Sequence, residues 1–323
     1  MLIDGLGRHI SYLRLSVTDR CDLRCTYCMP EGFQSDDEPR EWLSFDELER
    51  LAGVFARQGV ERIRLTGGEP LLRRNLPELA ARLAAVPGIR DLSLSTNGTR
   101  LAACAEDLRR AGVTRLNVSL DSLDRARVQS IARRDVLPQI LDGLEAARGL
   151  GFRQIKINMV ALPDTAHEEI EAMTGYCMAR GFILRLIETM PVGQSGRNAG
   201  FIDLRPVMQR MREQFGLIDG VVPGGGPARY LVSPDRRFQI GFITALSQHF
   251  CETCNRIRLA ANGTLHLCLG RDEAVDFRQL MRSGRSDAEI LAALQAGLAH
   301  KPARHDFGNT QHRVIRMMSA TGG

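Results

Sequence analysis

Apolar and β-branched residues occur along the first two thirds of the chain in short runs that alternate with longer amphipathic segments. Between the first two runs, the residues from Ser44 to Glu47 have the form of a capping box, and apolar side chains then recur at helical spacing from Phe45 to Phe55. The runs with strand character lie at 14–18, 62–68, 92–98, 115–121, 155–161 and 182–188. The pattern therefore predicts alternating strands and helices.

Glycines punctuate this alternation and predict the ends of the helices. They stand at positions 59, 88, 112, 151 and 181, each before a run with strand character. Repeated units of this kind predict right-handed crossovers and a parallel sheet. An open doubly wound sheet and a barrel both fit, but six regular repeats with polar residues at the strand carboxyl ends favour a complete or partial barrel.

The regular alternation stops after about residue 200. Beyond it, the sequence predicts a loop at 221–230, a strand at 237–244, a hairpin turning at Asn262-Gly263 and a last helix at 287–298. The end of the chain, from Ala320 to Gly323, has the composition of a flexible tail. We therefore expect two domains, a barrel at 1–218 and a C-terminal region at 219–323.

Composition narrows the function classes. A chain of 323 residues with 44% hydrophobic content can form a sizeable core, and its net charge of +5 is too small to indicate a nucleic-acid partner. No apolar run approaches the roughly 20 residues of a membrane helix, and the N-terminus lacks the apolar segment of a signal peptide. We expect a cytoplasmic protein without nucleic-acid or membrane partners, in which cysteines stay reduced. Lys156 and Lys301 are its only lysines.

Three cysteines, Cys21, Cys25 and Cys28, follow the first predicted strand within eight residues. Three thiolates this close must surround one compact, thiophilic centre. Zinc with a distant fourth ligand is one interpretation. An iron–sulfur cluster is the other, and three cysteines would leave one iron open for a substrate or cofactor.

A second trio, Cys251, Cys254 and Cys268, has the spacing of metal ligands but again lacks a fourth. By itself it favours zinc, with His249 or His266 completing the site, although each histidine is more typical of a surface or hairpin residue. Two cysteine trios and many arginines also fit a zinc-stabilised nucleic-acid-binding protein. The barrel-like alternation and the Thr-Gly-Gly-Glu-Pro element at 66–70 argue against that hypothesis.

Several basic residues lie inside predicted strands, where a charge is costly unless it is paired or binds a ligand. Arg256 and Arg258 are two apart and share one face of an extended strand. For Lys156 we favour ligand binding over a structural ion pair, whereas Arg14 at the start of a strand fits either a ligand contact or a solvated end.

Other chemistry-bearing residues leave alternatives open. Asp121 and Glu188, at strand ends, could pair with Lys156 or Arg185. Met190 is more typical of core packing than of a ligand contact. The isolated cysteines at positions 104 and 177 fall within predicted helices and are typical of small buried hydrophobic residues.

Taken together, two motifs resemble the radical S-adenosylmethionine (SAM) superfamily. They are the C-x3-C-x2-C segment at 21–28, with Tyr27, and the Thr-Gly-Gly-Glu-Pro segment at 66–70. A closer resemblance, to the GTP 3′,8-cyclase (MoaA) family, rests on 14–21, 64–71, 95–98, 117–121, the second cysteine trio and the terminal Gly-Gly. It spans essentially the whole chain. It implies a partial (βα)6 TIM-type barrel with a C-terminal extension that carries a second iron–sulfur cluster.

The resemblance also implies an activity and a set of site residues. The activity is conversion of GTP to (8S)-3′,8-cyclo-7,8-dihydroguanosine 5′-triphosphate, the first step of molybdenum cofactor biosynthesis. The implied cofactors are SAM and two [4Fe–4S] clusters, one on each cysteine trio, with a guanine nitrogen at the open iron of the second. The implied SAM contacts are Tyr27, Gly68, Ser119 and Met190, and the implied GTP contacts are Arg14, Arg64, Ser95, Lys156, Arg256 and Arg258.

Within this set, the resemblance places the first trio together with Arg256 and Arg258 in the catalytic machinery. Gly322 and Gly323 are expected to thread toward the active site. Ser95 stands where family members often have threonine, and it keeps the hydroxyl donor.

The implied partners are an external one-electron donor of the flavodoxin or ferredoxin type, and cyclic pyranopterin monophosphate synthase as the next enzyme. We also expect a homodimer. The alternative hypothesis keeps the superfamily and changes the substrate, because peptide-modifying members also carry extra C-terminal cysteines.

Overall fold

The structure is a computed structural model that describes residues 1–32, 42–222, 226–308 and 314–322. A twelve-stranded sheet runs through it in the order β12-β11-β10-β1-β2-β3-β4-β5-β6-β9-β8-β7. The strands from β1 to β6 are parallel to their neighbours, and β10 and β9 extend this parallel core at its two sides. The sheet is thus an open, partial barrel, as the sequence predicts.

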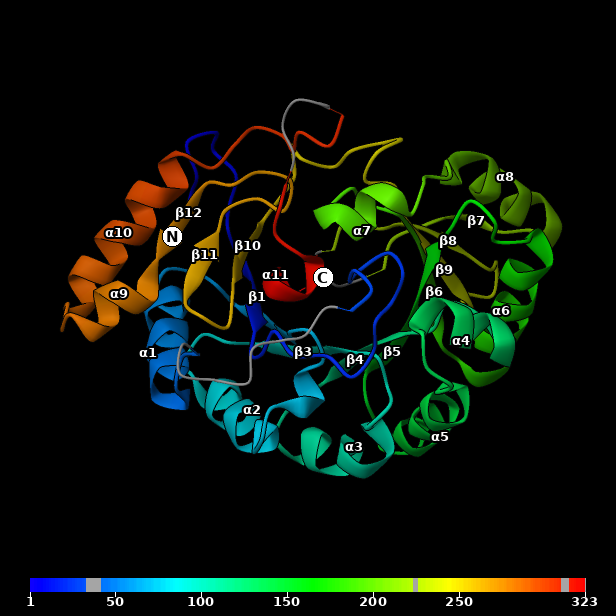
Figure 1. The fold of residues 1–323 in the computed structure, drawn as a ribbon, viewed down its shortest axis with the longest axis horizontal. Helices are drawn as coiled ribbons and strands as arrows, with labels where there is room; N and C mark the ends of the chain where they lie inside the picture. The colour runs from blue at the N-terminus through cyan, green and yellow to red at the C-terminus, as the bar shows by residue number, and fades with distance from the viewer. Residues whose placement is uncertain (33–41, 223–225, 309–313, 323) are drawn as a thin grey trace.

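The strands are β1 (Tyr12–Ser16), β2 (Arg62–Thr66), β3 (Asp91–Thr96), β4 (Arg115–Ser119), β5 (Gln154–Ala161), β6 (Ile183–Glu188), β7 (Ile218–Gly220), β8 (Arg229–Val232), β9 (Gln239–Ile243), β10 (Arg256–Leu259), β11 (Thr264–His266) and β12 (Ala274–Asp276). The helices are α1 (Phe45–Ala56), α2 (Leu76–Ala85), α3 (Leu101–Arg110), α4 (Arg125–Ala132), α5 (Leu137–Arg148), α6 (His167–Arg180), α7 (Gly193–Asn198), α8 (Leu204–Phe215), α9 (Phe277–Arg282), α10 (Asp287–Ala299) and α11 (Met318–Thr321). In Figure 1 the helices from α1 to α6 follow the outer side of the curved sheet, while α11 lies near its centre.

Local sequence signals account for the helix ends. Ser44 and Glu47 form the predicted capping box at the start of α1, with the Ser44 hydroxyl accepting from the Glu47 amide at 3.1 Å and the Glu47 carboxylate accepting from the Ser44 amide at 2.7 Å. Gly181 ends α6 in the left-handed conformation at φ +70°, which costs glycine little. The chain can therefore turn at once into β6.

The six N-terminal strands, the strand at 237–244, the Asn262-Gly263 hairpin and the last long helix are confirmed, with boundaries that differ by a few residues. Two other predictions are wrong. The stretch 221–230 is not all loop, because β8 begins at Arg229 and pairs with β9. The described part of the tail is ordered: α11 forms there, and Ser319 and Thr321 are buried.

One hydrophobic core joins the early and late parts of the chain. β10 pairs in parallel with β1, and Phe277 of α9 packs edge-on against Phe55 of α1 at a centroid distance of 5.6 Å. Both rings are fully buried. The division into domains at 1–218 and 219–323 stays a prediction.

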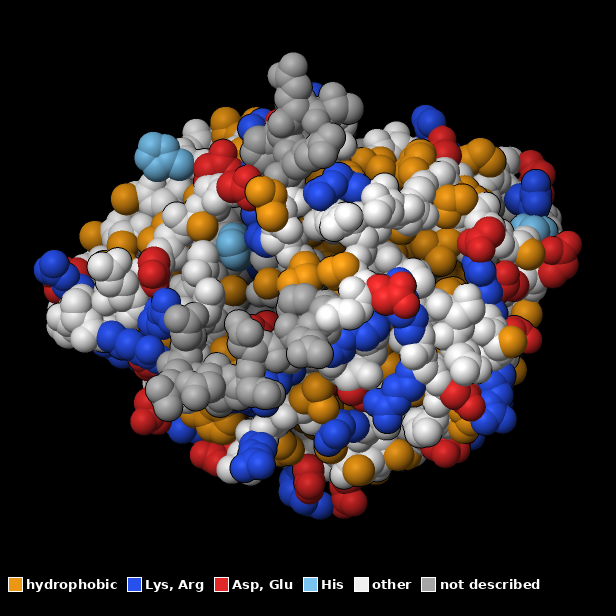
Figure 2. Space-filling view, viewed as in Figure 1, with side chains coloured by type: hydrophobic (Ala, Val, Ile, Leu, Met, Phe, Trp, Pro, Cys, Tyr) orange, Lys and Arg blue, Asp and Glu red, His pale blue; other side chains and the backbone are white. Residues whose placement is uncertain are grey.

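The face of the molecule seen in Figure 2 shows basic and acidic side chains interspersed over the surface. Many of them form exposed ion pairs, such as Arg125 with Asp135 at 2.6 Å. Among the helices of the described residues, none has both the length and the apolar composition that crossing a bilayer requires.

Candidate active site

A cavity of about 300 Å³ lies inside the curved sheet. Its walls come from the carboxyl ends of the barrel strands, from the loop that follows β1, from the segment before β10, and from α11. Most of the residues expected at the site line it: Arg14, Cys21, Cys25, Tyr27, Cys28, Arg64, Gly68, Ser95, Ser119, Met190, Cys251, Cys254, Arg256, Arg258 and Cys268. Tyr12 and Ser319 lie 307 positions apart in sequence and still line one chamber.

The first cysteine trio lies on the loop after β1. The Cys28 and Met29 amides both donate to the Cys25 carbonyl, which folds the loop into a tight turn. Burial raises the pKa of Cys21 to about 12 and that of Cys28 to about 11, and it also raises the pKa of Cys25 well above the usual range. Thiols in such surroundings need a positive centre to ionise, which fits the anchoring of a metal cluster.

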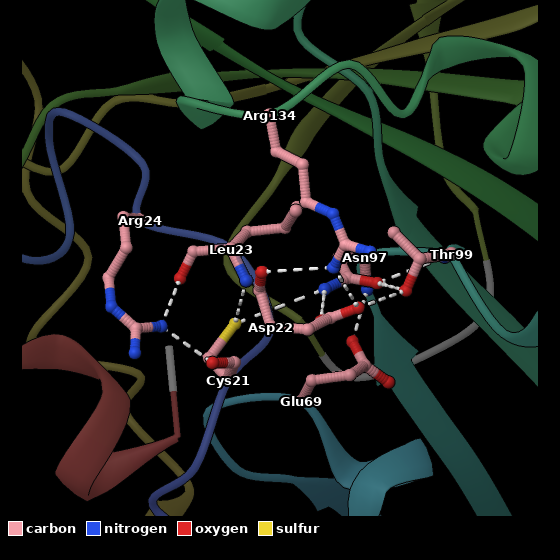
Figure 3. A network of polar contacts seen from close by, with 8 residues as sticks. All are labelled: Cys21, Asp22, Leu23, Arg24, Glu69, Asn97, Thr99 and Arg134. Carbon is pink, nitrogen blue, oxygen red and sulfur yellow. Dashed lines mark hydrogen bonds and ion pairs between the residues drawn. The ribbon is translucent and has the colours of Figure 1, made fainter. Parts of the chain in front are cut away.

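A polar network ties this loop to the second and third strands (Figure 3). Glu69 is fully buried and accepts from the Asn97 amide at 2.6 Å and from the Thr96 hydroxyl at 2.7 Å. The Asn97 side chain donates to Asp22 at 2.7 Å, and Thr99 donates to the other Asp22 oxygen at 2.8 Å. Burial raises the pKa of Glu69 to about 7. The network fixes the loop relative to the Gly-Gly-Glu-Pro segment.

Two glycines allow these segments to approach closely. A Cβ on Gly67 would overlap the Thr18 carbonyl, and one on Gly68 would lie 2.6 Å from the Arg20 carbonyl carbon. The Gly68 amide donates to the Thr18 carbonyl at 2.9 Å. Glycine is therefore required here by steric contact with the cysteine loop, and the backbone stays open to the cavity.

The second cysteine trio forms another wall of the cavity. The Cys254 amide donates to the Cys251 carbonyl at 3.1 Å, directly before β10. Burial opposes ionisation of Cys254, but Arg256 and Lys301 outweigh it and lower the pKa of this thiol to about 7. All six cysteines of the two trios are free thiols. Across the described ranges, no three Cys, His, Asp or Glu side chains are already drawn together as a closed metal site.

The two histidines considered as zinc ligands have other surroundings. His249 lies 3.4 Å from Glu252 and edge-on to the His305 ring. His266 is in the hairpin strand β11, where burial and Arg316 lower its pKa to about 4. No interaction between either ring and a thiol of the second trio occurs in the described parts of the chain.

Arginines from adjacent strands meet in register on the cavity side. Arg14 of β1 is paired with Arg64 of β2 on one side and with Arg258 of β10 on the other. Burial and the nearby Arg256 lower the pKa of Arg258 to about 10, and burial lowers that of Arg14 well below its usual range. Buried cations held this close repel one another, so the arrangement favours an anionic ligand.

Lys156 lies in a neighbouring smaller hollow together with Arg64, Arg115 and Arg185. Its ammonium donates to the Tyr230 hydroxyl at 3.2 Å. Burial, followed by the charges of Arg185, Arg115 and Arg64, lowers the pKa of Lys156 to about 6. A nearby anion favours the charged form of an amine. Binding of an anion in this hollow should therefore raise the pKa of Lys156 and protonate it.

The proposed ion pairs of Asp121 and Glu188 are wrong. Arg185 instead donates to Asn117 and Asn158, both at 2.6 Å. Asp121 accepts from the Tyr27 hydroxyl at 2.8 Å. Glu188 is fully buried and binds the Leu246 and Ser247 amides. These carboxylates stabilise the cavity walls instead of neutralising its cations.

Sequence reasoning missed three side chains that complete this cationic hollow: Arg115, Arg185 and Tyr230. Arg185 carries a usable signal, because it is a charged residue inside a predicted strand, as Lys156 is. In the structure it pairs with Asn158, which lies two residues after Lys156 on the same face of β5. Tyr230 carries none, since it lies in a stretch predicted to be a loop.

The tail enters the cavity region near the arginines. The Arg258 guanidinium donates to the Gly322 carbonyl at 3.2 Å. A Cβ on Gly322 would overlap the Thr66 hydroxyl, and the residue has φ +69°. Met318 and Ser319 line the cavity itself. The Gly322 carbonyl thus lies within hydrogen-bond reach of Arg258, while Gly323 lies outside the described residues, and a role of the tail in the active site stays a prediction.

Family models match both parts of the chain. The radical SAM superfamily matches residues 15–177, and Molybdenum Cofactor Synthesis C matches residues 182–307. GTP 3′,8-cyclase 1 of Pseudomonas aeruginosa is 44% identical over 99% of this chain and 99% of its own length. GTP 3′,8-cyclase of Erythrobacter litoralis is 46% identical over 100% of this chain and 98% of its own length.

A solved structure has the same fold. SuiB of Streptococcus suis, bound to S-adenosylmethionine, superposes with a TM-score of 0.66 at 14% identity over 92% of this chain and 69% of SuiB. That likeness concerns the fold alone, whereas the sequence identity to the cyclases extends over the whole length. The chain belongs to the GTP 3′,8-cyclase family of the radical SAM superfamily.

Proposed function

We propose that this enzyme converts GTP to (8S)-3′,8-cyclo-7,8-dihydroguanosine 5′-triphosphate, the first step of molybdenum cofactor biosynthesis. Family membership supports a [4Fe–4S] cluster and SAM as cofactors. The observation that carries the proposal is a single cavity that holds two cysteine trios and the in-register arginines. The alternative of a peptide-modifying enzyme loses its support, because the full-length relatives are GTP 3′,8-cyclases.

The residues of the first trio fit an iron–sulfur cluster in their chemistry, since three thiols line the same cavity. When bound there, the cluster supplies the electron that cleaves SAM. We assign SAM to Tyr27, Gly68, Ser119 and Met190, which line the same cavity. Gly68 keeps the backbone accessible, and Asp121 holds the Tyr27 ring through its hydroxyl.

The triphosphate is assigned to the cationic strands. Arg14, Arg64 and Arg258 present adjacent guanidinium groups, and Arg256 lines the same cavity. We further assign Lys156 and Arg185, from the neighbouring hollow, to the phosphate groups. A bound anion would relieve their mutual repulsion, and several fixed cations can position a nucleotide for catalysis. Ser95, which lines the cavity, offers a hydroxyl donor to the substrate.

We also assign a second [4Fe–4S] cluster to Cys251, Cys254 and Cys268, which line the cavity wall beside Arg256 and Arg258. Three protein ligands leave one position for a guanine nitrogen. The remaining assignments are Gly322 and Gly323 at the active site, an external one-electron donor of the flavodoxin or ferredoxin type, cyclic pyranopterin monophosphate synthase as the next enzyme, a homodimer, and a cytoplasmic location.

The test is an anaerobic incubation of the enzyme with GTP, SAM and a one-electron reductant. Mass spectrometry should detect the cyclic nucleotide together with 5′-deoxyadenosine. Lys156→Met should lose most cyclic product while iron content stays at the wild-type level, because this side chain lines a hollow that has no cysteine in its wall. Release of 5′-deoxyadenosine without any cyclised GTP would overturn the substrate assignment, and modification of candidate peptides would restore the alternative.

A further inference from the structure

Lys301 is a buried lysine whose role the proposed reaction leaves open. It follows α10 and is only 4% exposed. Its ammonium donates to the Arg256 carbonyl at 3.0 Å and to the Leu267 carbonyl. Lysine is almost never fully buried unless it is paired, and within the described residues no carboxylate forms an ion pair with Lys301. The two carbonyls belong to residues that lie within two positions of Cys254 and Cys268.

Two further basic side chains hold the main chain of the second trio. Arg8, from the N-terminal segment, donates to the Cys251 carbonyl at 2.9 Å. Arg316, from the tail, donates to the Cys268 carbonyl at 3.0 Å. With Lys301 they form what we name the carbonyl clamp: Arg8, Lys301 and Arg316. Every stretch that carries a cysteine of the second trio is thus fixed by a cation from a distant part of the chain.

The three members of the clamp differ in charge balance. Arg8 forms an ion pair with Asp4 at 2.6 Å, and Arg316 forms one with Asp272 at 2.6 Å. Lys301 has main-chain acceptors instead. Burial disfavours its charge, and the thiols of Cys254 and Cys268 are close enough to act in the opposite direction. Lys301 is therefore the clamp residue whose positive charge is available to the cysteines.

We propose that the carbonyl clamp positions the second cysteine trio and that the Lys301 ammonium offsets the negative charge of its thiolates and of the cluster they hold. This inference rests on the proposed function, since it presumes an iron–sulfur cluster at that trio. A [4Fe–4S] centre held by three thiolates is a net anion, and a buried cation beside it stabilises both its assembly and its reduction. Without a bound anion, the same buried charge would lower the stability of the fold.

Matched variants separate this role from a purely structural one. Lys301→Met removes the charge and the donors while keeping an unbranched side chain of similar size. Lys301→Arg keeps both charge and donors. Lys156→Met is the control, because it also replaces a buried lysine side chain, but in the hollow lined by Arg64, Arg115 and Arg185. Circular dichroism of each variant verifies that the fold survives.

The measurement is iron and sulfide content after anaerobic reconstitution, followed by redox titration monitored by electron paramagnetic resonance. Wild type and Lys156→Met should bind roughly eight irons per chain, the content of two [4Fe–4S] clusters. Lys301→Met should fall toward roughly four. Where its second cluster still assembles, the midpoint potential should move to more negative values, while the first cluster keeps its own. Lys301→Arg should restore iron content and potential toward wild type.

Two results would overturn the inference. One is Lys301→Met with full iron content and an unchanged potential. The other is equal loss of iron from both trios. A wild-type protein with only roughly four irons would instead refute the second cluster of the proposed function. The failure of the proposed cluster is in this way distinguishable from the failure of the role given to Lys301.

Discussion

Gly322 offers a sharp test of how the tail reaches the cavity, through the substitution Gly322→Ala. The residue has φ +69°, and an added Cβ would overlap the Thr66 hydroxyl and come within 2.9 Å of the Thr66 Cβ. Both atoms belong to Thr66, which is buried at the end of β2 and cannot move easily. The alanine variant should therefore destabilise the docked tail and leave the barrel intact.

The size of the effect follows from two costs. A left-handed conformation costs a non-glycine residue about 1–2 kcal/mol, and overpacking adds about 1–3 kcal/mol. Together they weaken docking by about 2–5 kcal/mol, which is roughly a 30- to 4,000-fold shift toward the undocked tail at about 1.4 kcal/mol per factor of ten. Gly216→Ala is a matched control, because Gly216 has φ +60° but no atom within 4 Å of the added Cβ.

Hydrogen exchange of the segment 314–322 measures docking directly. We expect amide protection in α11 to fall by at least roughly 30-fold in Gly322→Ala, with a parallel loss of cyclised GTP and unchanged iron content. In Gly216→Ala the segment 314–322 should keep wild-type protection. A protected tail in Gly322→Ala would refute the steric argument. Loss of protection with undiminished product would refute the assignment of the tail to the active site.

Three further predictions follow from the site and the core. Because burial and neighbouring cations lower the pKa of Lys156 to about 6, its amine is mostly neutral at pH 7.5, and GTP binding should take up a proton. GTP affinity should then fall by up to about tenfold per pH unit as pH rises above 6. Calorimetry in two buffers of different ionisation enthalpy tests this, and equal heats would contradict it. Gly68→Ala would displace the Arg20 backbone and should weaken SAM binding at least about tenfold in equilibrium dialysis. Unchanged SAM affinity would show that the cysteine loop can shift to accommodate the added methyl group. Phe277→Ala removes the edge-on contact with Phe55 and should lower the free energy of unfolding by about 3–5 kcal/mol in one cooperative transition. Two separate transitions in denaturant would show instead that the C-terminal region unfolds on its own.

The sequence predicted the barrel strands well because each is a local apolar run that ends at a glycine or polar turn. Strand boundaries were less accurate, since hydrogen bonds to neighbours decide them. β1 begins at Tyr12, two residues before the predicted start, because Tyr12 pairs with both Arg62 and Arg256. Such pairings join residues far apart in the chain and leave no periodic signal.

The residues of the candidate site also divide into those that belong to local motifs and those that depend on the strand register. Cysteine spacing and the Gly-Gly-Glu-Pro segment are local motifs, so both trios and Gly68 could be found directly. Arg185 was considered only as an ion-pair partner, because the hydrogen bonds to Asn117 and Asn158 depend on the strand register. The tail was predicted flexible from composition, although contacts with Thr66 and Arg258 hold Gly322 in place.

The cavity concentrates positive charge where negative groups have to arrive, and this has a consequence for stability. The adjacent guanidinium groups of Arg14, Arg64 and Arg258 repel one another, and burial together with nearby arginines lowers the pKa of Lys156 to about 6. Thiolate-bound clusters and a triphosphate would neutralise these cations from two sides of the same chamber. Each anion should reduce the electrostatic repulsion among the buried cations. Clusters and GTP should therefore stabilise the fold cooperatively.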